Sequence, residues 1–522
     1  MLSQPRIAIR DALAGAAVLG VLAIVVLARQ APPFVTDSDF AMTELYTELA
    51  ARGQLAVGSY SRFGWHHPGP FYFYLQAPIY AAGGHRAMSL FGVALLINLA
   101  AILTLVAVTV RANRGLLLIG LTAACVAMAW RAPRLLASPW VGHIAVFPAL
   151  AFVAISAAII AGRARWLPLA IVFGSFIAQT HLAFAPPAGV LGAAAIAAAV
   201  MHSRRARAPL RAPLVVSALA GLILWLPPVI EALANGGGNL GALWRFFQSE
   251  SATGQPLRDA FAVWSYGLAG VLRPDFGLPW GGHFVLHGLE WMMPAAIAQA
   301  VLLPAIAIRD ANAARPFDAA VALAAFLATV TGLWAITRIE GAIVDHEIFW
   351  LAALGALNLA IIAAAALRLI GRAWIDHAAS RIARPACASL MLLTAFLGVQ
   401  HLRDLTSYEM RRTTPRRIPM AYDAIRTFMR DEAVRKPVIE MQAGSWSEGA
   451  GVMLRLLQDD VPAAVTDVSV PIFTRAFAPA GDEDALITIS PRYGYHREQQ
   501  ARPGNITLLE ADPVFVNAVK TR

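Results

Sequence analysis

Residues 36–80 read TDSDFAMTELYTELAARGQLAVGSYSRFGWHHPGPFYFYLQAPIY. This stretch begins with Asp37, Asp39 and Glu44, and a histidine- and proline-rich run at 66–70 follows. An Asp at the centre of a membrane helix costs roughly 2.5–3.5 kcal/mol, so charged and imidazole groups beside lipid usually have a function. Because apolar runs lie on both sides of the stretch, we predict a functional loop at a membrane surface.

The rest of the chain has the composition of a membrane protein. It has 522 residues, of which 58% are hydrophobic and 14% charged, with a mean hydropathy of +0.59. Soluble proteins carry about 25% charged residues. About eleven apolar runs approach the length needed to cross a hydrocarbon core of roughly 30 Å. They are 11–29, 87–110, 115–131, 140–162, 166–181, 184–202, 212–233, 285–308, 317–337, 342–368 and 385–402.

Arginines predict the orientation of these spans. Arg-rich segments alternate with Arg-poor ones, and the positive-inside rule places the Arg-rich set in the cytoplasm. The N-terminus is then cytoplasmic, while the loop at 30–85 and the tail at 403–522 lie on the opposite side. The net charge of +10 is explained by these arginines and predicts no nucleic-acid partner. The Arg-rich segments contain Arg6/Arg10, Arg111/Arg114, Arg163/Arg165, Arg204/Arg205/Arg207/Arg211, Arg309/Arg315 and Arg368/Arg372/Arg381/Arg384.

Composition predicts two domains. Residues 1–402 form an all-α polytopic membrane domain, and residues 403–522 form a small soluble α/β domain. The second prediction rests on alternating helix and strand patterns. Helical patterns cover 421–434 and 449–457, and strand-like runs cover 437–441, 463–466, 485–489 and 506–510.

Asp37 and Asp39 allow two interpretations. Thr36 and Asp39 have the spacing of a capping box at the start of a helix whose apolar face carries Met42, Leu45 and Leu49. Two carboxylates one residue apart also suit chemistry, because one can act as a base while the other binds a metal or orients an acceptor. Their proximity to Glu44 at an interface favours the chemical interpretation.

The run His66-His67-Pro68-Gly69-Pro70 cannot form a regular helix, because proline lacks an N–H and restricts the residue before it. Irregular backbone at membrane depth is tolerated where it lines a cavity. His66, His67 and nearby Arg62 are therefore candidate ligands for an anionic substrate.

A second charged cluster lies near the start of the tenth apolar run. It contains Arg338, Glu340, Asp345 and His346, and the predicted topology puts it on the same side of the membrane as residues 30–85. The membrane domain contains no lysine, so arginine and histidine are the side chains that can stabilise a phosphate there. We predict that both clusters contact one phosphate.

The acidic pair after the first span, the helix that follows it and the aromatic His-Pro-x-Pro segment together resemble the GT-C superfamily of integral-membrane glycosyltransferases. The pattern is most similar to protein O-mannosyltransferase and aminoarabinose-transferase branches from bacteria. Those families carry Asp-Glu and His-Pro-Pro or Lys-Pro-Pro motifs, whereas this chain has Asp37-Ser38-Asp39 and an inserted Gly69.

The resemblance implies an inverting hexosyl- or pentosyltransferase in a bacterial inner membrane. Its donor would be a sugar linked to a polyprenyl phosphate, and its acceptor an envelope glycan, lipid or protein on the periplasmic side. Asp37 or Asp39 would deprotonate the acceptor, and the pair could hold Mg²⁺ or Mn²⁺; no other cofactor is expected. Glu44, Arg62, His66, His67, Arg338, Glu340, Asp345 and His346 would bind substrates.

Two other functions are compatible with the composition. A lipid or glycan transporter, or a flippase, would place charged residues near the middle of the membrane. Here the acidic residues and histidines gather on one side, which favours an enzyme. An envelope assembly or sensor protein would instead use 403–522 as its binding module.

Overall fold

The computed structural model describes residues 20–21, 24–25, 34–112, 115–132, 134–207, 209–249, 253–274, 276, 288–411 and 414–521. The predicted span at 11–29 therefore lies almost wholly outside the described residues. The chain forms two compact units, each described by itself below. The first unit comprises Met1–Val25, Ala94–Val229 and Trp244–Leu402, and the second comprises Val26–Val93, Ile230–Leu243 and Arg403–Arg522.

The first unit is helical. Eight helical stretches of the described residues are long and apolar enough to cross a membrane, and they coincide with eight of the predicted runs. Two more predicted runs form the shorter helices α5 and α8. The main helices are α4 (Ala87–Val110), α5 (Leu116–Arg131), α6 (Val141–Ile144), α7 (Val146–Ile160), α8 (Leu167–Thr180), α9 (Ala185–Ala206), α10 (Arg211–Ala234), α11 (Gly238–Gln248), α12 (Leu257–Ala269), α13 (Leu289–Asn312), α14 (Pro316–Ile336), α15 (Asp345–Ile348) and α16 (Trp350–Arg411). The predicted polytopic all-α domain is confirmed.

Burial separates the helices at the core of this unit from those that face outward. In the span Val141–Ile160, 89% of the residues are buried, and α7 packs against α8, α9 and α14. In Arg211–Ala234 only 11% are buried. A helix that is apolar all round and exposed in the protein needs another apolar environment, so the outer surface of α10 suits lipid.

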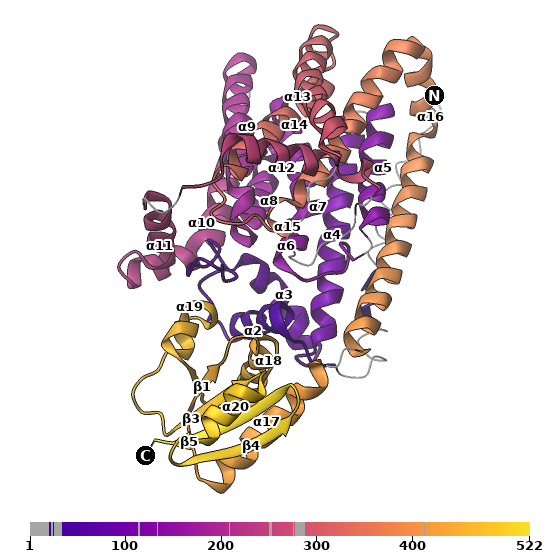
Figure 1. Cartoon of the computed structure of the whole chain (residues 1–522). Coiled ribbons are helices and arrows are strands. Elements are labelled where there is room, and N and C mark those ends of the chain that lie inside the picture. Colours follow the sequence, from indigo (N-terminus) through magenta and orange to yellow (C-terminus); the bar gives the residue numbers. More distant parts are fainter. Residues whose placement is uncertain are drawn as a thin grey trace. The chain divides into compact units, whose positions relative to one another are not determined.

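Helix α16 is continuous over 62 residues, which would extend about 93 Å if it were straight. Figure 1 shows instead that its orange ribbon turns over and runs back. It therefore provides two of the apolar spans, Asp345–Ile370 (together with α15) and Trp374–Arg411. Near the bend, the buried Arg368 pairs with Asp318, and its Nε lies 3.0 Å from an oxygen of Asp376. This ion cluster satisfies charges that would be costly to leave unpaired next to lipid.

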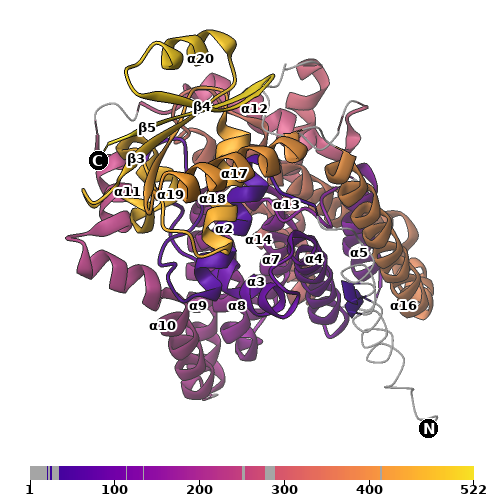
Figure 2. The same ribbon diagram turned by 90° about the horizontal axis from the view of Figure 1, so that it is seen from below.

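The second unit contains a five-stranded sheet in the order β2-β1-β3-β5-β4. β1 is parallel to β2 and β3, whereas β5 is antiparallel to both β3 and β4. Figure 2 shows α20 on one face of the sheet and α17 and α18 on the other. The elements are α2 (Ser38–Ala51), α3 (Phe71–Ala82), α17 (Thr414–Asp431), β1 (Pro437–Met441), α18 (Trp446–Gln458), β2 (Ala464–Val465), α19 (Val470–Phe473), β3 (Ala485–Ser490), α20 (Tyr493–Gln500), β4 (Asn505–Ala511) and β5 (Val514–Lys520). The α/β prediction is confirmed.

Helix α2 joins the first loop to this sheet-containing region, because it packs against both α3 and α18. The predicted helix is present, and its predicted apolar face of Met42, Leu45 and Leu49 is buried. Every residue from Phe40 to Ala50 is buried. Polar residues of α2 are therefore enclosed by protein, which makes their hydrogen bonds important for stability.

Candidate active site

Asp37 and Asp39 lie at the start of α2. Asp37 occupies the N-cap position, and its carbonyl accepts hydrogen bonds from the N–H groups of Phe40 and Ala41. Its carboxylate is only 1% exposed and makes no capping hydrogen bond. The Thr36 hydroxyl donates to Glu44 at 2.6 Å rather than to the helix backbone. The capping-box interpretation is therefore wrong, because a buried carboxylate takes the hydroxyl that a cap would use.

The residue between the two aspartates has a strained backbone. Ser38 has φ of +50°, in the left-handed region that costs a non-glycine residue on the order of 1 kcal/mol or more. Such strain persists only where the surrounding structure holds it, and it is commonest at functional sites. The two carboxylates are thus presented by a backbone that the fold has forced into place.

Asp39 accepts a hydrogen bond from the hydroxyl of Tyr60. Burial raises the pKa of Tyr60, and the negative charge of Asp39 raises it further. Tyr60 therefore keeps its proton and remains a donor at physiological pH. This contact connects the start of α2 to the loop that carries the histidines.

That loop is a short hairpin. Tyr60 pairs with His66 in an antiparallel bridge, and the His67 N–H donates to the Ser59 carbonyl at 2.7 Å. Gly58 sits where a Cβ atom would lie 2.7 Å from the His67 carbonyl oxygen, so only glycine fits. Arg62 is exposed at the tip, with its guanidinium 4.9 Å from the Phe63 ring centre. The predicted irregular backbone is confirmed, because helix α3 begins only at Phe71.

The backbone of the two histidines is held by Asn239. Its side-chain oxygen accepts the His66 N–H at 2.7 Å, and its Nδ2 donates to the carbonyls of His66 and His67 at 2.8 and 3.4 Å. Burial lowers the pKa of His66 to about 4, so this imidazole is neutral at physiological pH. His67 is also buried, with its ring 5.6 Å from that of Trp65. His66 thus contributes hydrogen bonding and packing, rather than a positive charge.

Glu44 lies in the middle of α2 and is fully enclosed. Besides Thr36, its carboxylate accepts hydrogen bonds from Tyr80 at 3.0 Å and from the amide of Gln458 at 3.2 Å. Burial raises the pKa of Glu44 to about 7, against the effect of these hydrogen bonds. Because Gln458 belongs to α18, this carboxylate connects the first loop to the C-terminal part of the chain.

Sequence reasoning missed two residues next to the aspartates. Trp446, the first residue of α18, has its ring 5.5 Å from that of Tyr60 in an edge-to-face contact. Burial raises the pKa of Glu448, and the charge of Asp37 contributes to the same shift. No local motif marks either residue, because their importance comes from the packing of α18 on α2.

The second predicted cluster lies in the first unit. Arg338 is exposed just after α14, with its guanidinium 5.3 Å from the Trp334 ring centre. Glu340 accepts a hydrogen bond from the Gly254 N–H at 3.0 Å. Asp345 begins α15, and the His346 that follows it lies among aromatic rings.

His346 belongs to a group of imidazole and indole rings. Its ring is 4.8 Å from Trp140 and 6.1 Å from His181, and His143 contacts Trp140 at 4.7 Å. His143, His181 and His346 each lie at or beside the start of an apolar span, at the end opposite to the Arg-rich segment. We call His143, His181, His346 and Trp140 the histidine cluster.

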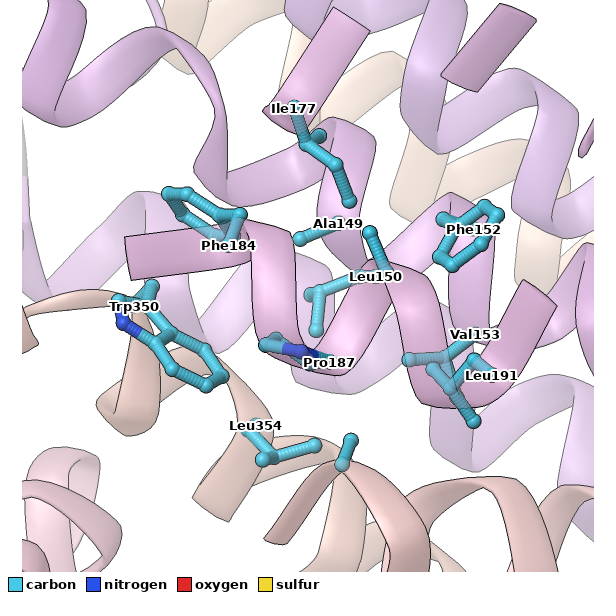
Figure 3. A pocket seen from close by; sticks show the side chains of 12 residues that line it. Ala149, Leu150, Phe152, Val153, Ile177, Phe184, Pro187, Leu191, Trp350 and Leu354 are labelled. Carbon is cyan, nitrogen blue, oxygen red and sulfur yellow. The ribbon is translucent and has the colours of Figure 1, made fainter. Parts of the chain in front are cut away.

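A small apolar hollow lies close to this cluster. Figure 3 shows Phe184 and Trp350 beside each other among its lining side chains. The Phe184 ring is 5.3 Å from Trp350 and 6.2 Å from His181, so it contacts both the hollow and the histidine cluster. The hollow is lined by Ala149, Leu150, Phe152, Val153, Ile177, Phe184, Pro187, Ala188, Leu191, Ala328, Trp350 and Leu354.

Within the described part of the chain, no three His, Cys, Asp or Glu side chains are grouped so that they could hold a metal ion. Asp37 and Asp39 alone suit Mg²⁺ or Mn²⁺ only if water or substrate oxygens complete the coordination, which is common for Mg²⁺. A metal at this pair stays a prediction.

No protein-family model matches the chain, and no curated protein matches it in sequence. Solved structures are similar in fold. Apo ArnT, an aminoarabinose transferase from Cupriavidus metallidurans, has 12% identity and a TM-score of 0.51 over 97% of this chain and 98% of its own. ArnT bound to undecaprenyl phosphate has 13% identity and a TM-score of 0.49 over the same shares. Apo oligosaccharyltransferase from Archaeoglobus fulgidus has 12% identity and a TM-score of 0.43 over 93% of this chain and 70% of its own. The chain therefore shares the fold of ArnT, and the fold that the resemblance in its first loop predicts is confirmed.

Proposed function

We propose that this protein is a membrane glycosyltransferase that moves a sugar from a polyprenyl-phosphate-type lipid to an acceptor hydroxyl on the extracytoplasmic side. One observation carries the proposal: Asp37 and Asp39 stand on either side of the strained Ser38 at the start of α2, in a chain with the ArnT fold. A carboxylate is suited to accept a proton from an acceptor hydroxyl, and Asp39 is only partly buried.

The reaction needs one base and one stabilised leaving group. Asp37 or Asp39 removes the proton from the acceptor hydroxyl as its oxygen attacks the anomeric carbon of the donor sugar. The bond from that carbon to the phosphate oxygen breaks, and the electron pair leaves with the lipid phosphate. Attack on the face opposite to the phosphate inverts the anomeric configuration. The other aspartate orients the acceptor.

The first unit supplies groups suited to the lipid donor. Its apolar hollow can contact isoprenoid units, and His346 and His181 lie near the rim formed by Phe184. Arg338, Glu340 and Asp345 lie in the same polar segment as His346, and the exposed Arg338 can pair with a phosphate. ArnT, whose fold this chain shares, has been crystallised with undecaprenyl phosphate. We propose the same class of lipid here.

The second unit supplies the acceptor side. Arg62 at the exposed hairpin tip and the neighbouring His67 are proposed to contact the acceptor, whereas Glu44 and His66 shape the site from within the fold. Mg²⁺ or Mn²⁺ bound by Asp37 and Asp39 would neutralise charge on the departing phosphate. The acceptor is proposed to be an envelope glycan, lipid or protein. The arginine distribution supports a periplasmic location for this loop and the C-terminal domain.

The test measures sugar transfer directly. Membranes containing the wild-type protein are incubated with a panel of undecaprenyl phosphates carrying a radiolabelled pentose or hexose, together with an envelope extract. We expect one donor to label the extract, and the Asp37→Asn/Asp39→Asn double variant to lose this labelling. Glu498→Gln, an exposed carboxylate of α20, serves as the control and should retain it.

Two results would overturn the proposal: no donor labels the extract, or the double variant labels it as well as the wild type does. Mass spectrometry of envelope glycans and lipids, with and without the gene, identifies the product. A change in lipid distribution across the membrane without loss of a glycosylated product would indicate a flippase instead.

A further inference from the structure

Helices α2 and α18 pack together with like ends adjacent. At their C-terminal ends, Arg52 donates to the Leu457 carbonyl at 2.7 Å and pairs with Asp460 at 2.6 Å. At their N-terminal ends, Glu448 lies close enough to Asp37 for their charges to interact. The first turn of α18, which begins in the C-terminal domain, therefore lies beside the carboxylate pair of the first loop.

Trp446 reaches Asp39 through one intermediate side chain. Its indole contacts the Tyr60 ring edge-to-face, and the Tyr60 hydroxyl donates to Asp39. The preceding Ser445 is fixed to the sheet, because its hydroxyl donates to the Ile489 carbonyl at 2.9 Å. An edge-to-face contact restricts the orientation of both rings. Trp446 thus limits where the Tyr60 hydroxyl can point.

We propose that Trp446 is a positioning residue for Asp39, so that the C-terminal domain is a working part of the transfer site. Trp446 orients Tyr60 and thereby Asp39. This inference rests on the proposed glycosyl transfer and adds to it that 403–522 is more than an anchor or a separate binding module.

The role of Trp446 is tested with a double-variant cycle in the labelled undecaprenyl-phosphate assay. We expect Trp446→Ala to lower kcat about tenfold with little change in the acceptor KM, and Trp446→Phe, which keeps an aromatic edge, to restore most of it. Tyr60→Phe should lower kcat by a similar factor. Adding Trp446→Ala to Tyr60→Phe should then lower kcat little further. Losses that multiply in the double variant would show that Trp446 does not act through Tyr60 and would overturn its role.

An aromatic residue far from the first loop serves as the control. Tyr493 of α20 is exposed, and its ring lies 5.8 Å from that of Phe515 in β5. Tyr493→Ala removes an aromatic ring without touching the first loop. It should retain wild-type kcat. A wild-type protein that transfers no sugar would refute the proposed function and this inference together. Active wild type with unchanged Trp446 variants would refute the inference alone.

Discussion

The carboxylate pair and the histidine cluster are assembled in different ways. Asp39 accepts a hydrogen bond from Tyr60, 21 positions along the chain, and helix α2, which carries Asp39, packs against α18. The histidines each come from the start of an apolar span, and ring contacts to Trp140 bring two of them together. The first site is therefore built by tertiary hydrogen bonds, whereas the second follows from where the spans begin.

Their chemistry differs in the same sense. The first site is acidic and suits proton removal from an acceptor, and the second is rich in imidazole and lies near an apolar hollow that suits a lipid chain. A sugar acceptor and a lipid donor require different groups from the site that binds them. A base requires exact orientation, while a lipid phosphate requires donors at the end of an apolar path.

The largest expected effect is a loss of kcat in variants of the carboxylate pair. Asp37→Asn and Asp39→Asn should each lower kcat for transfer by about 10³-fold, because a general base typically contributes 10²–10⁴-fold. The measurement is single-turnover transfer from the labelled undecaprenyl-phosphate sugar. Asp423→Asn, an exposed residue of α17, is the control. If either single variant keeps full activity, that aspartate is not needed for proton transfer.

The second effect tests whether the carboxylate site depends on buried tertiary contacts. The folded-state pKa of Glu44 is raised from 4.5 to about 7. The protonated Glu44 side chain therefore contributes fully to the free energy of unfolding when the pH is below its unfolded pKa. This contribution, on the order of 3 kcal/mol, is lost as the pH rises through about 7. Thermal unfolding in detergent should show the wild type losing stability from pH 5 to pH 8. Glu44→Gln should show a flatter profile, and equal slopes would contradict the raised pKa.

The third effect concerns the clamp on the histidine loop. Asn239→Ala removes the side-chain oxygen that accepts the hydrogen bond of the buried His66 N–H. We expect the free energy of unfolding to fall by about 2 kcal/mol. The melting temperature should fall, whereas Asn312→Ala, at the exposed end of α13, should change it little. An unchanged melting temperature for Asn239→Ala would mean that water replaces the amide.

The smallest effect concerns the donor side. Arg338→Ala and His346→Ala should each raise the donor KM by about tenfold, roughly the 1.4 kcal/mol expected for loss of a charge-assisted contact, and leave the acceptor KM nearly unchanged. Arg338→Lys keeps the charge and should show an intermediate donor KM. Equal increases in both KM values would remove the distinction between a donor site and an acceptor site.

Much of the fold could be predicted from residue patterns. Apolar runs longer than a bilayer is thick fix the spans, and prolines at 68 and 70 exclude a helix before Phe71. Strand β5 was missed although it lies between β3 and β4, since a strand near the C-terminus with Asn517 in its middle lacks a clear alternating pattern. The complete burial of α2 was not predicted, because the pattern of one helix does not show what packs against its polar side.

The sequence by itself determined the membrane class, the order of the spans and the presence of Asp37 and Asp39 in a polar loop. These follow from local properties: hydropathy over one segment, and the conformational limits of proline. Only the tertiary structure decided that Asp39 is oriented by Tyr60, that His66 is neutral, and that Trp446 and Glu448 lie beside the aspartates. Those properties depend on burial and on contacts between residues up to about four hundred positions apart, such as Asp37 and Glu448, and no local pattern encodes either.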